Sequence, residues 1–157
     1  GVCAIMPGAG DASLEQALAG EFPKATRTRI DDGADGWLAE VVGRIAAQFA
    51  EPAQPTRALP ADLRATAFQW QVWNALTRIP AGQTRSYAEV AREIGRPTAA
   101  RAVARACASN RLALIVPCHR VIREDGSMGG YRWGLQAKDA LLNFERKQFS
   151  RPAPVQR

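Results

Sequence analysis

The sequence predicts an α/β protein of the α+β type, with a small N-terminal lobe of strand and helix and a mainly helical C-terminal domain. Two observations predict this organisation. Short apolar runs occur between segments of helical periodicity, and a proline-containing stretch at residues 51–55 divides the chain. At 157 residues, the chain can bury one good core or form two small lobes that share an interface.

Positive charge gathers in the second half of the chain. Residues 1–61 contain 5 Lys or Arg and 8 Asp or Glu, whereas residues 62–157 contain 16 and 7. A basic half in a small protein favours a polyanionic partner, most often nucleic acid, although a solvated basic surface is the alternative. We therefore expect a scaffold lobe with its linker at 1–61, a DNA-binding domain at 62–149 and a flexible tail at 150–157.

Several classes of protein are disfavoured by composition. No apolar run approaches the roughly 18 residues needed to cross a bilayer, and no signal peptide is evident, so we expect a soluble, cytoplasmic protein without membrane contact. Cys3, Cys107 and Cys118 are odd in number and lack Cys-x-x-Cys spacing, which argues against a disulfide framework and against a cysteine-rich zinc site. His119 is the single histidine. We therefore expect no metal and no cofactor.

The first lobe is predicted from its N-terminus onward as one strand and two helices. Residues 1–6 have strand character, and a helix should run from Asp11 towards Phe22. A loop rich in Asp and Gly at 31–36 precedes a second helix at about 37–49, where apolar residues recur at helical spacing. This lobe offers no nucleophile, carboxylate pair or phosphate loop, so we assign it a scaffold role.

The second half begins with a helix at 66–76, which Pro80-Ala81-Gly82 brings to an end. Ser86 and Glu89 then have the spacing of a capping box, in which each side chain bonds the other residue's backbone amide. The apolar residues that follow recur at i, i+3, i+4 and i+7, which predicts a second helix in this half.

A further short helix completes a helix-turn-helix pattern. Gly95 supplies the C-terminal turn of the preceding helix, and Thr98 is expected to cap a helix over 99–108. Arg101 and Arg105 lie on one face of this alanine-rich segment, which can approach another surface closely. The two arginines could reach phosphates or enter a groove. The alternative is an alanine-rich packing helix with two solvated arginines.

Residues 112–116 form an apolar, β-branched run that predicts a buried strand, and Pro117-Cys118-His119-Arg120 follows it directly. A thiol is a weak nucleophile until it loses its proton, and an imidazole can take that proton near neutral pH. The dipeptide alone leaves open a buried structural cysteine beside a histidine that caps the strand.

The last part of the chain predicts a glycine-containing loop at 125–130 and a helix over about 136–148. The apolar side of this helix is expected to hold Ala137, Leu141 and Phe144. Glu145 lies four residues after Leu141 and should share that inward face. A buried carboxylate needs a partner, and His119 is the candidate; a half-exposed Glu145 is the alternative.

Together these residues resemble a known family. Pro117-Cys118-His119-Arg120-Val121, with Asn110 eight residues before the cysteine and Glu145 twenty-seven after it, is similar to the O6-alkylguanine-DNA alkyltransferases. The Tyr131-Arg132-Trp133-Gly134 segment and the helix at 99–103 make the chain most similar to the C-terminal repair domain of the bacterial adaptive-response (Ada) type. The resemblance is close over residues 62–148 and loose over the first lobe.

The resemblance implies a reaction and a role for each catalytic candidate. The alkyl group of an O6-alkylguanine, with O4-alkylthymine as a further candidate substrate, would pass to the Cys118 thiol in a single turnover. His119 would deprotonate the thiol through water, and Glu145 would orient the imidazole. Asn110 would hold the turn that carries the cysteine. Tyr87 would help to rotate the nucleotide out of the duplex and could protonate the departing guanine.

The resemblance also implies a DNA-binding mode and a fold. Arg101 would fill the gap left by the flipped base, and its helix would enter the minor groove of double-stranded DNA. The DNA-contacting candidates are Thr98, Ala99, Arg101, Ala102 and Arg105, and the base-pocket candidates are Val121, Tyr131, Arg132 and Trp133. The implied fold is a ribonuclease H-like first lobe followed by a winged-helix-like helix-turn-helix domain, and the protein would act as a monomer in a bacterial cytoplasm.

Two departures and two alternatives accompany the resemblance. The chain begins with the strand at 1–6, where the family usually has earlier strands, so we expect a shortened lobe or a piece of a longer protein. The four-cysteine zinc domain of the Ada type is not in this sequence. A non-catalytic protein that binds alkylated guanine is the competing function, but such proteins lack the acceptor cysteine. A papain-like hydrolase does not fit the adjacent Cys118 and His119.

Overall fold

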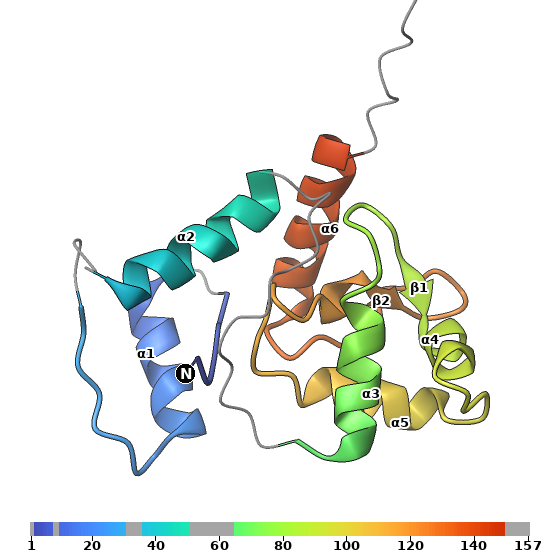
Figure 1. Ribbon diagram of the computed structural model, residues 1–157, viewed down its shortest axis with the longest axis horizontal. Coiled ribbons are helices and arrows are strands. Elements are labelled where there is room, and N and C mark those ends of the chain that lie inside the picture. The colour runs from blue at the N-terminus through green and yellow to red at the C-terminus, as the bar shows by residue number, and fades with distance from the viewer. Residues whose placement is uncertain (1, 8–9, 31–35, 51–64, 150–157) are drawn as a thin grey trace, which may run out of the picture.

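The computed structural model describes residues 2–7, 10–30, 36–50 and 65–149 (Figure 1). The elements in chain order are α1 (Asp11–Glu21), α2 (Trp37–Ala50), α3 (Ala67–Leu76), β1 (Arg85–Ser86), α4 (Tyr87–Glu93), α5 (Ala100–Ala108), the 3-10 helix η1 (Cys118–Arg120), β2 (Val121–Ile122) and α6 (Leu135–Phe149). The predicted linker, domain boundary and tail, and most of the predicted loop at 31–36, lie outside the described residues.

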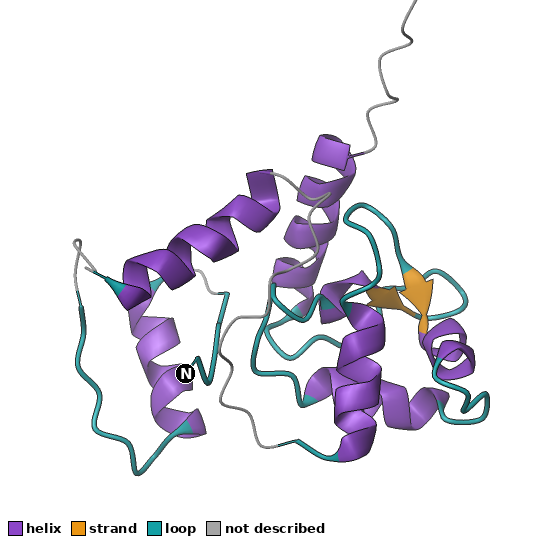
Figure 2. Cartoon of the chain, viewed as in Figure 1, coloured by secondary structure: helices purple, strands orange, loops and turns teal. Residues whose placement is uncertain are grey.

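The described chain is mainly helical, with one small parallel sheet of two strands (Figure 2). In this sheet, Arg85 pairs with Val121 and Ser86 with Ile122. β1 leads directly into α4, and β2 directly follows η1, so the sheet joins the start of the helix-turn-helix to the segment that carries Cys118. This architecture agrees with the predicted α+β class.

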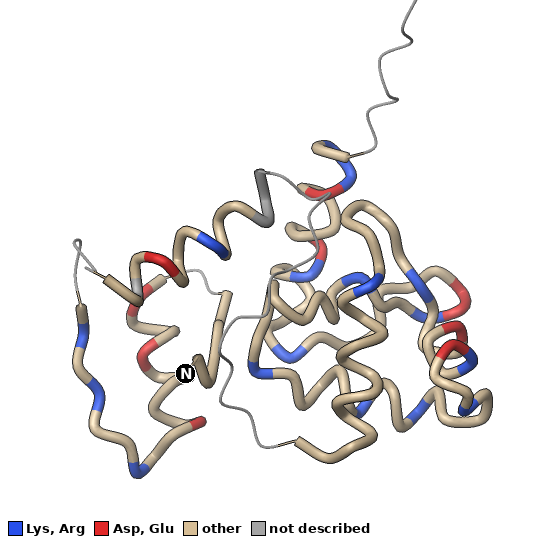
Figure 3. Tube along the Cα trace, in the orientation of Figure 1, with Lys and Arg blue, Asp and Glu red and all other residues tan. Residues whose placement is uncertain are grey.

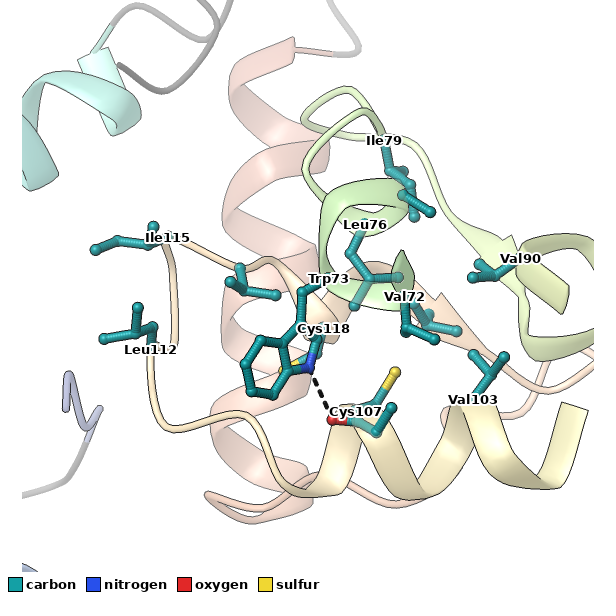
Figure 4. Packing of buried hydrophobic residues seen from close by; sticks show 14 of the residues in the cluster. Val72, Trp73, Leu76, Ile79, Val90, Val103, Cys107, Leu112, Ile115 and Cys118 are labelled. Carbon is teal, nitrogen blue, oxygen red and sulfur yellow. Dashed lines mark hydrogen bonds between the residues drawn. The ribbon is translucent and has the colours of Figure 1, made fainter. Parts of the chain in front are cut away.

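The core lies where α3, α4 and α5 pack together (Figure 4). Val72, Leu76, Val90 and Val103 are fully buried there, because their apolar side chains face one another across the three helices. Trp73 joins this core and donates from its indole Nε1 to the carbonyl oxygen of Ala106 at 2.9 Å, which links α3 to α5. The helices that form the predicted DNA-binding unit are therefore fixed by the same core.

The helix-turn-helix begins at the predicted capping box. The Glu89 amide donates to Ser86 Oγ at 3.1 Å, and the Ser86 amide donates to Glu89 Oε2 at 2.6 Å. Gly95 has a φ of +72°, the left-handed conformation expected of a helix C-terminal turn. The prediction that Thr98 caps the next helix is wrong, because Ala99 closes a turn onto the Arg96 carbonyl and itself precedes the first residue of α5.

The predicted strand at 112–116 is a turn. Leu112 makes one isolated bridge with Ile5, Leu114 has a φ of 75°, and the Val116 amide donates back to the Leu112 carbonyl at 3.0 Å. The Asn110 side chain also bonds backbone groups of Leu112 and Val116. These local bonds occupy the groups that a strand partner would need, so apolar, β-branched composition alone did not decide the backbone conformation.

The described part of the first lobe comprises an extended segment and the helices α1 and α2. The predicted strand at 1–6 is reduced to bridge pairing: the Ile5 amide donates to the Arg111 carbonyl, and the Ala113 amide donates to Ile5. Val41 of α2 is buried and reaches the common core. No sheet of this lobe's own is present among its described residues, so a ribonuclease H-like lobe remains a prediction.

Helix α6 turns a different face inward from the one predicted. Lys138, Leu142 and Glu145 are its buried residues, whereas Phe144 is 39% exposed. The inward stripe is therefore shifted by about one residue from the Ala137–Leu141–Phe144 face, although Glu145 belongs to both descriptions. The shift arises because Lys138 and Glu145 make buried polar contacts with the segment around Cys118, and these contacts orient the helix.

Candidate active site

The Cys118 thiol lies at a cavity between α5 and the loop before α6. Its side chain is buried, at 3% exposure, in η1 directly after Pro117. The cavity has a volume of about 290 Å³. It is lined by Tyr87, Ala104, Cys107, Ala108, Cys118, Gly130, Tyr131 and Arg132. Residues of α4, of α5 and of the loop at 130–132 therefore surround the Cys118 sulfur.

Asn110 ties the turn that carries the cysteine. It is fully buried, and its Nδ2 donates to the Val116 carbonyl at 2.8 Å and to Cys118 Sγ at 3.1 Å. Its Oδ1 accepts from the Leu112 amide at 2.9 Å. One amide side chain thus holds both the backbone before the cysteine and the sulfur itself.

His119 and Glu145 form a buried pair. His119 Nε2 lies 2.8 Å from Glu145 Oε1, and their side chains are 1% and 3% exposed. Arg120 also donates to this carboxylate, from Nε to Oε2 at 3.0 Å and from Nη2 to Oε1 at 2.8 Å. The Gly82 amide donates to Oε2 at 3.0 Å. The carboxylate that sequence spacing placed near His119 is therefore held from three directions.

The charges of this cluster define the state of the imidazole. Burial opposes ionisation of Glu145, but bonds from His119 and Arg120 outweigh it and lower its pKa to about 2. Burial lowers the pKa of His119 below its ordinary value, against the opposing effect of Glu145. A neutral His119 beside an ionised Glu145 donates from Nε2, which leaves Nδ1 able to accept a proton. Nδ1 has no hydrogen-bond partner among the described residues.

The thiol rests in its neutral form. Burial raises the pKa of Cys118 above its ordinary value, against smaller opposing effects of the Asn110 hydrogen bond and the Lys138 charge. The cysteine therefore needs a base to become a nucleophile, because ionisation by solvent alone is disfavoured. His119, the next residue, is the nearest candidate by sequence.

Sequence reasoning missed Lys138. It is fully buried, and its Nζ donates to the carbonyls of Val121 at 2.6 Å and of Met128. Its ammonium thereby ties α6 to both ends of the loop over the cavity. The spacing of Lys138 and Glu145, seven residues apart on a helix, would have placed them on one face, but buried lysines are rare. Arg120 stood inside the motif and was likewise given no role.

The structure separates the four base-pocket candidates. Tyr131 and Arg132 line the cavity with Cys118, whereas Val121 and Trp133 are not among its lining residues. Val121 is fully buried and presents its carbonyl to Lys138. Trp133 packs against the Arg132 guanidinium, which lies 5.3 Å from the ring centroid. Spacing could not distinguish these positions, because the path of the loop before α6 brings the consecutive residues 130–132 to the cavity and leaves Trp133 outside it.

Helix α5 connects the cavity to the surface. Ala104, Cys107 and Ala108 line the cavity, while Arg101 and Arg105 project outward and are exposed. Figure 3 shows that the α5 region carries basic and no acidic residues. Thr98 is also exposed, and Ala99 and Ala102 are half-buried. One side of α5 therefore forms a wall of the cavity at Cys118, and another side of the same helix presents the two arginines.

Within residues 2–7, 10–30, 36–50 and 65–149, no group of three or more His, Cys, Asp or Glu is arranged to hold a metal ion. Over the same ranges, no helix combines the length and the apolarity that crossing a membrane requires.

Comparisons with known proteins agree on one family. A model of the family described as "6-O-methylguanine DNA methyltransferase, DNA binding domain" matches residues 67–147. The bifunctional transcriptional activator/DNA repair enzyme Ada of Escherichia coli is 46% identical over 151 residues, which are 96% of this chain and 41% of that protein. The chain thus spans about two fifths of the length of Ada.

Shorter relatives match over most of their length. A methylated-DNA–protein-cysteine methyltransferase of Mycolicibacterium paratuberculosis is 43% identical over 141 residues, covering 83% of this chain and 85% of that protein. The crystal structure of Mycobacterium tuberculosis OGT in complex with DNA superposes with a TM-score of 0.63 at 41% identity, covering 76% of this chain and 79% of that one. The chain therefore belongs to the family of methylated-DNA–protein-cysteine methyltransferases.

Proposed function

We propose that the protein repairs double-stranded DNA by moving the alkyl group of an O6-alkylguanine onto Cys118 Sγ, once per molecule. The observation that carries this proposal is a buried thiol at a cavity whose wall is also the arginine-bearing helix α5. The names of the relatives support the same chemistry. Action on chromosomal DNA implies a location in the bacterial cytoplasm.

The buried cluster supports a route for the proton and the alkyl group. His119 Nδ1 takes the thiol proton, directly or through one water, and Glu145 stabilises the imidazolium that forms. The sulfur attacks the alkyl carbon, the carbon–O6 bond breaks, and its electron pair stays with the guanine. Tyr87 donates a proton to the departing guanine and recovers one from the His119 imidazolium through water, which leaves a thioether on the protein. A thiolate is a poor leaving group from an alkyl carbon, so the thioether persists and one turnover is expected.

Helix α5 is suited to bind DNA through the minor groove. Arg101 and Arg105 are exposed on one side, and the alanines around them let the helix backbone approach a groove. Thr98 and Ala99 precede the helix, and Ala102 lies beside Arg101, so we expect all three to contact the DNA backbone. Because an O6-alkylated guanine pairs poorly, extruding it costs less than the few kcal/mol needed for a well-paired base. We expect a monomer to suffice for this.

Arg101→Ala should slow repair in duplex DNA by roughly tenfold and leave transfer from free O6-benzylguanine base within about twofold. The reason is that Arg101 would fill the stack only when a nucleotide is extruded. The measurement is the single-turnover rate with each substrate. Arg146→Ala, which removes one exposed charge from α6, should leave both rates near wild type. Equal slowing of both substrates by Arg101→Ala would contradict a flipping role.

Gly129→Ala should slow duplex repair by about tenfold or more through Tyr87. Gly129 has a φ of +63°, and a Cβ there would lie 3.0 Å from the Tyr87 hydroxyl and 3.2 Å from its ring. Gly126→Ala is the matched control, because its φ is +81° but a Cβ would meet nothing within 4 Å. Both should lose about 1 kcal/mol of stability from the left-handed backbone. Only Gly129→Ala should slow repair. Equal repair rates in Gly129→Ala and Gly126→Ala would show that the placement of the Tyr87 side chain does not matter for repair.

The decisive test is the intact mass of the protein after incubation with duplex DNA containing O6-methylguanine. A single methyl increment, mapped to the peptide with Cys118, is the expected result, in stoichiometric yield that does not grow with excess DNA. An unchanged mass together with tight lesion binding would instead identify a non-catalytic lesion-binding protein. A catalytic excess of repaired DNA would contradict the single turnover.

A further inference from the structure

A carboxylate from the first lobe reaches the wall of the thiol cavity. Glu21 is the last residue of α1, and its side chain is only 14% exposed. One of its oxygens accepts from Arg111 Nε and the other from Arg132 Nη2. The lobe that was assigned only a scaffold role therefore contributes a partly buried carboxylate next to the wall of the cavity.

Arg132, which lines the cavity with Cys118, is held in three ways. Besides Glu21, its Nη1 donates to the Ala108 carbonyl at 3.0 Å, and its guanidinium stacks 5.3 Å from the Trp133 ring centroid. Ala108 also lines the cavity. The planar guanidinium is thus fixed as a piece of cavity wall, whereas an unpaired arginine would have several rotamers open to it.

Glu21 remains charged in this position. Burial disfavours its ionised form, but the hydrogen bonds and charges of Arg111 and Arg132 prevail and lower its pKa below the ordinary value. Arg111 additionally lies over the Phe22 ring, 5.7 Å from its centroid. Arg111 therefore joins the lobes and is not among the residues that line the cavity, whereas Arg132, the second partner of Glu21, does line it.

The contact between Glu21 and Arg132 is not needed to attach the first lobe, because other contacts already attach it. The backbone of Ile5 already bonds Arg111 and Ala113, and Arg111 ties the end of α1 to the same segment. Arg132 adds a contact at the cavity itself, because Arg132 and its backbone partner Ala108 both line the cavity. That division indicates two separate roles for the two oxygens of Glu21.

We infer that Glu21 is a positioning residue that holds Arg132 against Ala108 and thereby limits the size of the alkyl group that can reach Cys118. This inference rests on the proposed alkyl transfer. A methyl group needs little space beside the sulfur, so its transfer depends weakly on this wall. A benzyl group needs the space that Arg132 occupies, so release of the guanidinium favours it selectively.

The test is Glu21→Gln in the full chain, with single-turnover rates measured for duplexes that contain O6-methylguanine or O6-benzylguanine. Glutamine keeps the shape of the side chain and removes the charge that holds Arg132. The expected result is a rise of roughly fivefold or more in the benzyl-to-methyl rate ratio. Arg132→Ala should raise the same ratio, and the double variant should add nothing further, because both changes release one wall.

Two controls separate positioning from docking. Glu15→Gln removes a charge from the same helix at a residue that pairs with Arg29, and it should leave the ratio unchanged. Arg111→Ala weakens the lobe contact but keeps the bond between Glu21 and Arg132, and it should lower the melting temperature without changing the ratio. A ratio that stays at the wild-type value in Glu21→Gln, or equal loss on both substrates, would overturn the inference. Absence of a methyl increment on the wild-type protein would instead refute the proposed function.

Discussion

Cys118→Ala is expected to abolish alkyl transfer completely while DNA affinity stays within roughly twofold of wild type. The thiol is the proposed acceptor, so no bond can form without it. It lies buried at the cavity, whereas the cations proposed to bind phosphate, such as Arg101 and Arg105, are exposed. The measurements are the intact mass after incubation with O6-methylguanine DNA and the dissociation constant for the same duplex at one stated salt concentration.

Cys3→Ala is the matched control for that experiment, since Cys3 is an exposed thiol outside the cavity. It should retain the full methyl increment. If Cys118→Ala still gained a methyl group, Cys107 would be the acceptor, because its thiol lines the same cavity. A large loss of DNA affinity in Cys118→Ala would show that the cysteine supports the binding surface as well as the chemistry.

Glu145→Gln is expected to lower the free energy of unfolding by about 3 kcal/mol and to slow alkyl transfer by about a hundredfold or more. The substitution leaves the charge of Arg120 without its carboxylate in a site where the Glu145 side chain is 3% exposed. It also removes the charge that stabilises a protonated His119. Urea unfolding and single-turnover rates measure the two effects.

Glu93→Gln is the control for the loss of one ion pair. Glu93 pairs with Arg78 on the surface, where the side chains are 38% and 62% exposed. An exposed pair contributes at most about 1 kcal/mol, and this one lies outside the cavity, so stability should change little and transfer not at all. A similar loss of stability in both variants would contradict the importance of the buried cluster.

The pH dependence gives a second, independent readout for Glu145. Its pKa is lowered from an ordinary 4.5 to about 2 in the folded protein, so its contribution to stability is complete above pH 4.5 and disappears as the pH falls towards 2. The stability difference between wild type and Glu145→Gln should shrink across that window. The acid limb of the transfer rate should also move to lower pH in the variant, because the His119 imidazolium loses its counterion. If the transfer rate of Glu145→Gln depended on pH as that of the wild type does, Glu145 would not support His119 during the transfer.

Local signals in the sequence were sufficient for much of the helical framework. The capping box at Ser86 and Glu89 predicted the start of α4, and Gly95 predicted its end, because each interaction closes within one helical turn. The predicted helix at 66–76 agrees with α3 and its capping residue Thr66. The pairing of His119 with Glu145 was also predicted, from the rule that a buried carboxylate needs a partner.

Other features were not accessible to the same reasoning. The run at 112–116 has the composition of a strand, yet Asn110 bonds its backbone and converts it into a turn. Lys138 looks like a surface residue in a helix, yet it satisfies carbonyls from a loop that closes over it. Both outcomes depend on partners that only the folded chain brings near.

The amino-acid sequence was enough to predict the helices, the basic second half and the residues of the motif around Cys118. The way those residues are held became visible only in the folded chain, where Arg120 and the Gly82 amide bind Glu145, and Glu21 of the first lobe binds Arg132 at the cavity wall. The physical reason is that a helix or cap is stabilised by groups a few residues apart. A buried charge, in contrast, must find its partners wherever the fold places them.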